Sequence, residues 1–320
     1  MPGPPVRHAD KAGNDRISIR SFHHSSYSAA GIAGERAERK LGVSVCLSAR
    51  ECAETVGEIV GVLVELREAG VIDEIVVVDA ASADGTAMVA ARAGAAVWQE
   101  AELMPAYGQV LGKGDAMWRA LSLLEGDLVC FLDADTEGFS SHFVTGLLGP
   151  LVCEPGVSFV KAFYRRPFTT DPGSEAQNRV SEVPQRGSEA EGGGRVNHLL
   201  ARPALELFYP ELAQVRQPLA GEVAATRELL GRLPFATGYG VEIAMLIDAW
   251  REVGLDGIAQ VDLEEHRNRH QPLSALTPMA FTVLATIARR LEQEGRLLET
   301  DAGLEAGPVE RPALASARVA

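Results

Sequence analysis

Two aspartates directly follow an unbroken apolar run near the middle of the chain: Asp133 and Asp135 come after Leu128–Leu132. Such a run predicts a strand that is buried on both faces, as the central strands of parallel sheets are. Ligands of open α/β sheets bind at the carboxyl ends of the strands, so both carboxylates are expected beside a ligand. A divalent metal on a diphosphate would offset the cost of placing them together. The alternative is a polar turn that ends the strand, because aspartate favours turns.

Two further acidic residues are expected at the same edge of the sheet. Asp79 ends a second predicted strand, Glu74–Asp79, and therefore shares the edge with the two central aspartates. Glu51 follows a first predicted strand, Val43–Leu47. Glu51 could accept a hydrogen bond from a base or a ribose hydroxyl. A solvent-exposed glutamate that opens a helix explains this residue equally well.

Several cations could bind anionic groups. Lys113 stands between two glycines, but a phosphate-binding P-loop would need GxxxxGK[ST]. Lys161, Arg165 and Arg166 form a cluster for which solvation is the usual explanation. Arg195 follows three glycines and opens a predicted helix, where backbone N–H groups and a guanidinium fork can hold an anion. We favour an anion site at Arg195 over a flexible linker.

Two more residues have both a structural and a chemical explanation. Glu242 stands in the first turn of a predicted helix, where capping explains it; a hydrogen bond to a sugar hydroxyl is the alternative. His266 follows a predicted strand, Ile258–Leu263. A lone histidine is usually structural or solvated, but one at a strand end can complete a metal site with a carboxylate.

The elements that must position these residues alternate along the chain. We predict strands at 43–47, 74–79, 95–98, 128–132, 157–163 and 258–263, and helices at 54–67, 86–93, 115–124, 140–151, 195–209, 240–253 and 273–297. This alternation is typical of a parallel sheet covered by helices. We expect residues 1–40 to be flexible, with Phe22–Tyr27 as a candidate docking stretch, 171–194 to be a long polar loop, and 301–320 to be frayed.

The composition is that of a soluble globular protein of 320 residues, with 46% hydrophobic and 23% charged residues. The net charge of -14 argues against a nucleic-acid-binding surface and requires local cations or a metal to capture an anionic substrate. The sequence has no apolar stretch near the roughly 20 residues that cross a bilayer and no signal-peptide core before residue 20. The four cysteines form no CxxC pair, which favours reduced thiols in a cytoplasm.

Several stretches, in order over residues 43–270, closely resemble the glucosyl-3-phosphoglycerate synthase family of GT-A glycosyltransferases, whose relatives include mannosyl-3-phosphoglycerate synthases. They are Asp79–Asp84, Gly112–Gly114, Asp133–Asp135, Val160–Pro167, Gly192–Val196, Gln217–Glu222, Gly238–Glu242 and His266–Asn268. The resemblance implies a Rossmann-like α/β fold, with a mostly parallel sheet flanked by helices and a helical acceptor-side C-terminal part. Residues 41–165 would form the nucleotide-sugar-binding half, and residues 166–300 the acceptor-binding half, of one GT-A domain.

The resemblance also implies an activity: retaining transfer of mannose or glucose from GDP-mannose or UDP-glucose to the 2-hydroxyl of 3-phosphoglycerate, giving a compatible-solute precursor. By motif match, the nucleotide sugar would be bound by Leu47, Ser48, Ala49, Glu51, Asp79, Lys113, Asp133, Tyr239 and Glu242. The acceptor would be bound by Gly194, Arg195, Asn197 and Asn268. Asp135, Leu219, through its backbone carbonyl, and Glu242 would act in catalysis.

The cofactor and partners follow from the same resemblance. Asp135 and His266 would hold Mg²⁺, and Mn²⁺ or Co²⁺ would suit the same mixed oxygen and nitrogen ligands. The protein is expected to be a cytoplasmic homodimer that binds a nucleotide sugar and 3-phosphoglycerate, and neither nucleic acid nor membrane.

Three features depart from the family pattern. Residues 47–51 read Leu-Ser-Ala-Arg-Glu where Pro-Ala-Leu-Asn-Glu is usual, and Ala80 stands where a serine is common. Both changes bear on the choice of donor base. The loop between Arg166 and Gly192 is longer than usual, which could alter how the acceptor enters.

Other functions remain as alternatives. A polyprenyl-phosphate sugar transferase should carry a membrane-docking segment, and a nucleotidyltransferase should carry a glycine-rich loop at the first strand; neither feature is found in the sequence. A glycosidase also uses two carboxylates but needs no nucleotide or metal. A nucleotide-sugar binding module would bind the donor without turnover.

Overall fold

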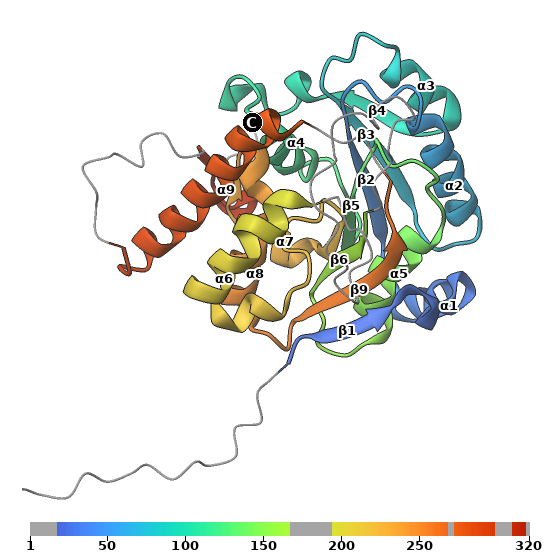
Figure 1. Ribbon diagram of the computed structural model, residues 1–320. Coiled ribbons are helices and arrows are strands. Elements are labelled where there is room, and N and C mark those ends of the chain that lie inside the picture. The colour runs from blue at the N-terminus through green and yellow to red at the C-terminus, as the bar shows by residue number, and fades with distance from the viewer. Residues whose placement is uncertain (1–17, 167–193, 268–271, 298–308, 318–320) are drawn as a thin grey trace, which may run out of the picture.

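The computed structural model describes residues 18–166, 194–267, 272–297 and 309–317 (Figure 1). Most of the long polar loop that we expected at 171–194 lies outside the described residues, and so does Asn268. Among the described residues, no helix combines the length and the apolar character that crossing a membrane requires.

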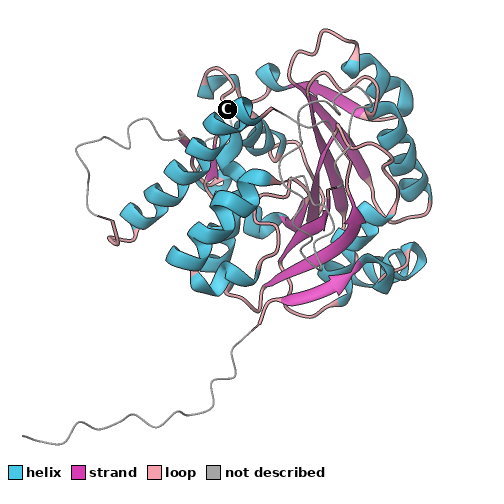
Figure 2. Ribbon diagram, viewed as in Figure 1, coloured by secondary structure: helices cyan, strands magenta, loops and turns pink. Residues whose placement is uncertain are grey.

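A single eight-stranded sheet runs through the described molecule (Figure 2), in the order β1-β9-β6-β7-β5-β2-β3-β4. Its strands are β1 (Arg20–His23), β2 (Val43–Ala49), β3 (Glu74–Asp79), β4 (Ala96–Gln99), β5 (Leu128–Asp133), β6 (Phe159–Arg165), β7 (Val223–Thr226) and β9 (Ile258–Glu265). β7 runs antiparallel to β5 and β6, and every other neighbouring pair is parallel. The predicted Rossmann-like, mostly parallel sheet is therefore confirmed.

Helices cover both faces of this sheet. They are α1 (Ala29–Arg39), α2 (Val56–Glu68), α3 (Thr86–Ala93), α4 (Lys113–Ala120), α5 (His142–Cys153), α6 (Arg202–Phe208), α7 (Arg227–Arg232), α8 (Val241–Val253) and α9 (Leu273–Gln293). In Figure 1, α2 and α3 lie on one side of the sheet and α6, α8 and α9 on the other. Helices α6–α9 form the helical C-terminal part that we predicted, and its role in binding an acceptor stays a prediction.

The central strand shows why the apolar run is unbroken. Leu128, Cys130 and Leu132 of β5 pack into the core shared with α2 and α5. Val129 and Phe131 point the other way, into the core shared with α4 and α8. Because successive side chains of a strand point to opposite faces, a strand between two cores needs apolar residues at every position. The strand ends where the sequence turns acidic.

The N-terminal expectation of flexibility is wrong for residues 20–39. β1 pairs in parallel with β9, with Arg20 opposite Ala259, and α1 follows it. The stretch Phe22–Tyr27 does dock: a Cβ on Gly149 of α5 would lie only 2.1 Å from the Tyr27 ring, so the ring rests directly on that glycine. The segment is ordered because it packs on α5 and pairs with β9, although its composition is that of a flexible terminus.

The C-terminal expectation of fraying is likewise wrong for residues 310–317. Strand β10 (Glu310–Arg311) pairs antiparallel with β8 (Phe235–Ala236), and a short 3-10 turn follows. Arg311 donates from Nε and Nη2 to the two carboxylate oxygens of the buried Asp115, both at 2.7 Å. This bidentate ion pair fastens the end of the chain to α4.

Candidate active site

The predicted acidic edge forms where β2, β3 and β5 end. The strand register places Ala49 opposite Asp79 and Ser48 opposite Asp133, so these side chains share one edge of the sheet. Asp79 is buried, and its Oδ2 accepts from the Ser82 N–H at 3.1 Å and from Gln99 Nε2 at 3.0 Å. Its Oδ1 is buried without a hydrogen-bond partner. That oxygen is suited to accept a hydrogen bond from a ligand.

Glu51 is exposed, but hydrogen bonds of its backbone and side chain fix its position. Its backbone has a positive φ of 53°, its N–H donates to Ser82 Oγ at 2.8 Å, and its Oε1 accepts from the Ala83 N–H at 2.8 Å. The residue therefore ties the loop after β2 to the loop after β3. This role adds to the two explanations that we gave from the sequence, and a contact of Glu51 with a base or a ribose hydroxyl stays a prediction.

Lys113, the first residue of α4, joins two acidic residues of the site. Its Nζ lies 2.6 Å from Asp133 Oδ1 and 3.0 Å from Glu242 Oε1, at the start of α8. Burial opposes the lysine charge, but the two carboxylates outweigh it and raise the pKa of Lys113 well above its ordinary value. The side chain thus offsets part of the negative charge of Asp133 and Glu242 and joins α4 to β5 and α8, while phosphate contact by Lys113 stays a prediction.

The loop that carries Leu219 packs directly on Asp133. A Cβ on Gly221 would lie 2.1 Å from Asp133 Oδ2, so a side chain at this position would displace the carboxylate. Gly114 is equally constrained, because a Cβ there would lie 2.0 Å from the Ala236 carbonyl oxygen. Both glycines are required by close approach: Gly221 seats the 217–222 loop on Asp133 of β5, and Gly114 lets α4 pack against Ala236 and Val241.

His266 is buried within a hydrogen-bonded cluster at the end of β9. Its Nε2 lies 2.9 Å from Glu222 Oε1 and 3.1 Å from Thr136 Oγ1, and its ring stacks on Tyr164 with centroids 4.5 Å apart. Tyr164 donates its hydroxyl to Glu222 Oε2 at 2.7 Å. Burial opposes ionisation of Glu222, but His266 and Tyr164 outweigh it and keep the pKa of this carboxyl far below its ordinary value.

Asp135 has the opposite electrostatic balance. Desolvation by the surrounding protein raises its pKa, Asp133 adds to the rise, and His266 offsets only part of it. A carboxylate with too little positive charge around it suits a divalent cation. The Nδ1 of His266 is buried without a hydrogen-bond partner, and donation from Nε2 to Glu222 would leave a lone pair on that atom. The chemistry of both residues therefore fits the predicted metal ligands.

The cationic stretch that includes the end of β6 is only partly solvated, because Arg165 is exposed whereas Lys161 and Arg166 are not. Lys161 is buried, and its Nζ donates to the Ala220 carbonyl at 2.5 Å. Burial lowers the pKa of Lys161 to about 8. Arg166 donates from Nη2 to the Tyr164 hydroxyl at 2.9 Å, which connects it to the cluster around His266. The expectation of solvation, drawn from charge alone, is wrong for both residues.

The structure describes three of the four residues that we predicted for the acceptor, and one of them contacts the loop that carries Leu219. Gly194 has a φ of 74°, and its carbonyl accepts from the His198 N–H at 3.1 Å, so a helical turn begins where the glycine run ends. Asn197 is buried, and its Oδ1 accepts from the Leu219 N–H at 3.4 Å. Tyr239 is exposed beside Glu242. Arg195 is half-buried at the start of the helical turn that follows Gly194.

The cluster around His266 contains residues that sequence reasoning missed. Thr136 and Tyr164 received no role, and Glu222 was not expected to contact the histidine. Tyr164 and Glu222 both stand inside stretches that the family resemblance singles out, which was the available signal. Their contact requires β6 and the 217–222 loop to meet β9, which no local pattern predicts.

Comparisons with known proteins add relatives over most of the chain. No protein-family model matches it. The glucosyl-3-phosphoglycerate synthase of Petrotoga mobilis is 40% identical over 286 residues, covering 88% of this chain and 84% of the relative. The enzyme of the same name from Mycolicibacterium smegmatis is 41% identical over 278 residues, covering 87% and 86%.

Solved structures agree with these relatives. Mannosyl-3-phosphoglycerate synthase from Rubrobacter xylanophilus matches with a TM-score of 0.81 and 45% identity, over 92% of this chain and 95% of that one. Glucosyl-3-phosphoglycerate synthase from Mycobacterium tuberculosis, in complex with Mn²⁺, UDP and glucosyl-3-phosphoglycerate, matches with a TM-score of 0.76 and 34% identity, over 92% and 98%.

Proposed function

The chain belongs to the glucosyl-3-phosphoglycerate synthase family, and from that membership we propose that it transfers a hexose from a nucleotide sugar to the 2-hydroxyl of 3-phosphoglycerate. The observation that carries the proposal is 40% identity over 88% of the chain to an enzyme of that name. The Mycobacterium tuberculosis relative was solved with UDP-glucose, phosphoglyceric acid and Mn²⁺ together, which are a donor, an acceptor and a metal of this reaction.

Either UDP-glucose or GDP-mannose is the donor. The relatives by sequence are glucosyl transferases, while a structural relative with 45% identity is a mannosyl transferase. The nucleotide would lie against Leu47, Ser48, Ala49, Glu51 and Asp79 at the sheet edge. The free Oδ1 of the buried Asp79 supports this placement.

Asp135 and His266 would hold the divalent cation, with Mg²⁺ as the physiological ion and Mn²⁺ or Co²⁺ able to replace it. When bound, the cation would stabilise the negative charge that develops on the departing diphosphate. Glu222 would fix the orientation and tautomer of the His266 ring through the 2.9 Å contact, as carboxylates do for metal-binding histidines.

Lys113, Asp133, Glu242 and Tyr239 would orient the hexose. The ion pairs of Lys113 with the two carboxylates place their remaining oxygens at fixed positions, where they can accept from sugar hydroxyls. On the acceptor side, Gly194, Arg195, Asn197 and Asn268 would bind phosphoglycerate. Asn197 would also hold Leu219, whose carbonyl would accept a hydrogen bond from the reacting hydroxyl.

We propose that the transfer retains the configuration of the donor, with the hydroxyl attacking on the face from which the diphosphate leaves. A double displacement needs a free carboxylate nucleophile. Glu222 is buried against His266 and Tyr164, and Glu242 is paired with Lys113, so neither is available for attack. The protein would act as a cytoplasmic homodimer that produces a compatible-solute precursor.

A nucleotide-release assay tests the function. The purified protein is incubated with Mg²⁺ or Mn²⁺ and each nucleotide sugar, with and without 3-phosphoglycerate. Release of UDP or GDP that depends on 3-phosphoglycerate is expected with at least one donor. Donor binding without release would indicate a binding module instead. Activity that appears only with polyprenyl-phosphate vesicles would indicate a polyprenyl-phosphate sugar transferase.

A further inference from the structure

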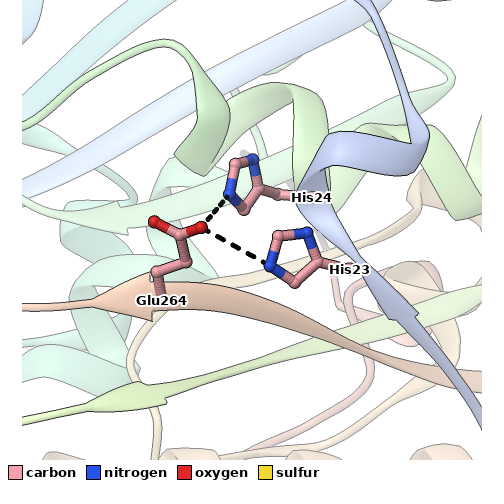
Figure 3. Close-up of side chains that lie close together, drawn as sticks. All are labelled: His23, His24 and Glu264. Atoms are coloured by element: carbon pink, nitrogen blue, oxygen red, sulfur yellow. Dashed lines mark ion pairs between the residues drawn. The ribbon is translucent and has the colours of Figure 1, made fainter.

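Two histidines and a glutamate converge at the outer edge of the sheet, and the glutamate lies on β9, the strand that His266 follows. His23 ends β1, His24 begins the next turn, and Glu264 lies near the end of β9 (Figure 3). Glu264 Oε1 lies 3.5 Å from His23 Nε2 and 3.2 Å from His24 Nε2, and the three ligand atoms all lie within 4.8 Å of one another. Both imidazoles point toward one carboxylate.

A bulge in β9 directs Glu264 to this position. Phe163 of β6 pairs with Asp262 and Arg165 pairs with Glu265, so β9 has one residue more than β6 between these pairs. Glu264 adopts a positive φ of 64°, which costs free energy for a residue other than glycine. Bulges commonly redirect a side chain. The neighbouring Glu265 points elsewhere, and its carboxylate bonds to Arg267.

The Nε2 atoms of both histidines face Glu264. His23 Nδ1 accepts from the Ser25 N–H at 3.3 Å and lies 2.7 Å from Ser25 Oγ, so a metal ion bound at Nε2 would take the place of the proton that the neutral ring carries there. His24 Nε2 is buried, and its contact with Glu264 lacks the alignment of a hydrogen bond. A third imidazole, His142, stacks on His24, but its Nδ1 contacts Ser140 Oγ and its Nε2 contacts the Leu263 carbonyl. His142 therefore supports the site without contributing a ligand.

We propose that His23, His24 and Glu264 form a second metal site, which binds a divalent transition-metal ion of the zinc type. Ligand atoms about 2.0–2.1 Å from a tetrahedral zinc ion are roughly 3.3 Å apart. The two separations from Glu264, 3.2 and 3.5 Å, approach this value, and the two histidine nitrogens lie within 4.8 Å of each other. Two imidazoles with one carboxylate are typical zinc ligands. His23 and Glu264 are exposed, so water can complete the coordination.

The position of the site gives it a consequence for the fold. β1 is the edge strand and is hydrogen-bonded only to β9 among the described strands. A metal shared between these two strands cross-links the edge of the sheet, two residues before His266. Zinc is therefore expected to raise the melting temperature of the protein.

Calorimetric titration of the metal-free, tag-free full-length protein with Zn²⁺ tests the proposal. The Asp135→Asn background weakens binding at the proposed catalytic site, so that one zinc ion per chain is expected to remain. His24→Ala and Glu264→Gln are each expected to weaken this binding roughly tenfold or more. Glu265→Gln is the matched control, because its carboxylate lies one residue away and bonds to Arg267; its zinc affinity should equal that of the background.

Either of two results would overturn the proposal. The Asp135→Asn protein could bind no zinc in the micromolar range, which would mean that the three residues form only an ion pair. Alternatively, Glu264→Gln and His24→Ala could bind zinc as the background does. X-ray absorption of the zinc-loaded background protein gives an independent answer if a variant fails to fold: a shell with two imidazoles is expected, and a shell without histidine contradicts the assignment.

Discussion

Glu222 is buried, and its contact with His266 fixes the orientation of the imidazole ring. Its two oxygens are used by His266 and Tyr164, and its low pKa keeps it ionised throughout the physiological range. An ionised acceptor holds the imidazole in one tautomer and makes it a stronger metal ligand. Glu222 is therefore a positioning residue whose effect should be visible in the metal dependence of the reaction.

Replacing this carboxylate gives a prediction. Glu222→Gln should raise the Mn²⁺ concentration needed for half-maximal activity by about 10- to 100-fold, because the amide supports the imidazole less well. Steady-state rates measured over a Mn²⁺ titration check this. Glu228→Gln is the control, since Glu228 pairs with Arg232 at the surface of α7. An unchanged Mn²⁺ requirement in Glu222→Gln would show that the glutamate does not act through the metal.

The lowered pKa of Lys161 leads us to predict that the stability of the protein depends on pH. Burial lowers its pKa from the ordinary 10.5 to about 8, so the folded protein loses this proton before the unfolded chain does. Below pH 8 the lysine is charged in both states, and its burial is fully unfavourable. Between pH 8 and pH 10.5 the lysine is neutral in the folded state and still charged in the unfolded chain, so its contribution to stability rises with pH.

A comparison with Lys161→Met isolates this contribution from those of other groups. The unfolding free energy of the wild type minus that of the variant should increase by about 3 kcal/mol between pH 8 and pH 10.5. This figure follows from 1.36 kcal/mol per unit of pKa shift. Urea unfolding of both proteins on either side of the window measures the gain. A difference that stays constant with pH would mean that folding does not lower the pKa of Lys161 and would contradict the prediction.

At the scale of elements, the active site depends on how closely the 217–222 loop approaches β5. Gly221 contacts Asp133 so closely that any Cβ would overlap the carboxylate. Gly221→Ala should therefore displace Asp133, lower kcat/KM by about 10²-fold and cost about 1–3 kcal/mol of stability. Kinetics and urea unfolding test both effects.

Gly231→Ala provides the matched control for this substitution. A Cβ on Gly231 meets nothing within 4 Å, and the residue lies in helix α7. Alanine there should leave kcat/KM unchanged and stabilise the protein by about 0.5–1 kcal/mol. If Gly221→Ala behaved like Gly231→Ala, the loop would have room that the described packing does not allow.

The elements that local pattern predicts are those with a long apolar signal. β3 ends at Asp79 as expected, and β5 ends at Asp133, one residue later than predicted, because a strand between two cores is apolar and stops at a charge. β7 was missed, since its four residues, Val223–Thr226, carry no periodicity and take their place from antiparallel pairing with β5 and β6. Its position is set by tertiary contacts.

The candidate site divides in the same way. Carboxylates at the ends of β3 and β5 could be predicted from strand ends alone, because parallel strands bring their carboxyl ends to one edge. The contact of Lys113 with Glu242 and that of Glu222 with His266 could not, because each joins segments far apart in sequence. The burial of Lys161 could not be predicted either, since a lysine close to two arginines in the sequence is typical of a solvated cluster.

At the scale of the whole molecule, buried ion pairs join the C-terminal elements to helices α4 and α8. Asp115 receives hydrogen bonds from Arg311 of β10 and from Arg119, and together these outweigh burial and keep the pKa of Asp115 below its ordinary value. A second set joins Asp248 of α8 to Arg290 of α9. These contacts fasten α9 and the end of the chain to α4 and α8.

Arg311→Ala should destabilise the protein by about 2–4 kcal/mol, because it leaves a buried carboxylate with one cation instead of two. Arg232→Ala is the control, since the partly exposed pair of Arg232 with Glu228 contributes about 1 kcal/mol or less. Urea unfolding gives both values. Equal losses in the two variants would mean that β10 contributes nothing to holding the end of the chain.

Proton NMR of the reaction product tests the central claim most directly. The protein is incubated with 3-phosphoglycerate, Mn²⁺ and the donor that supports nucleotide release, and the product is isolated. The account predicts a hexosyl-3-phosphoglycerate linked through the 2-hydroxyl, with the small anomeric coupling of an α-glucoside for UDP-glucose, or the one-bond carbon–proton coupling of an α-mannoside for GDP-mannose. A β-linked product would contradict retention, and free hexose with unmodified 3-phosphoglycerate would contradict the transfer itself.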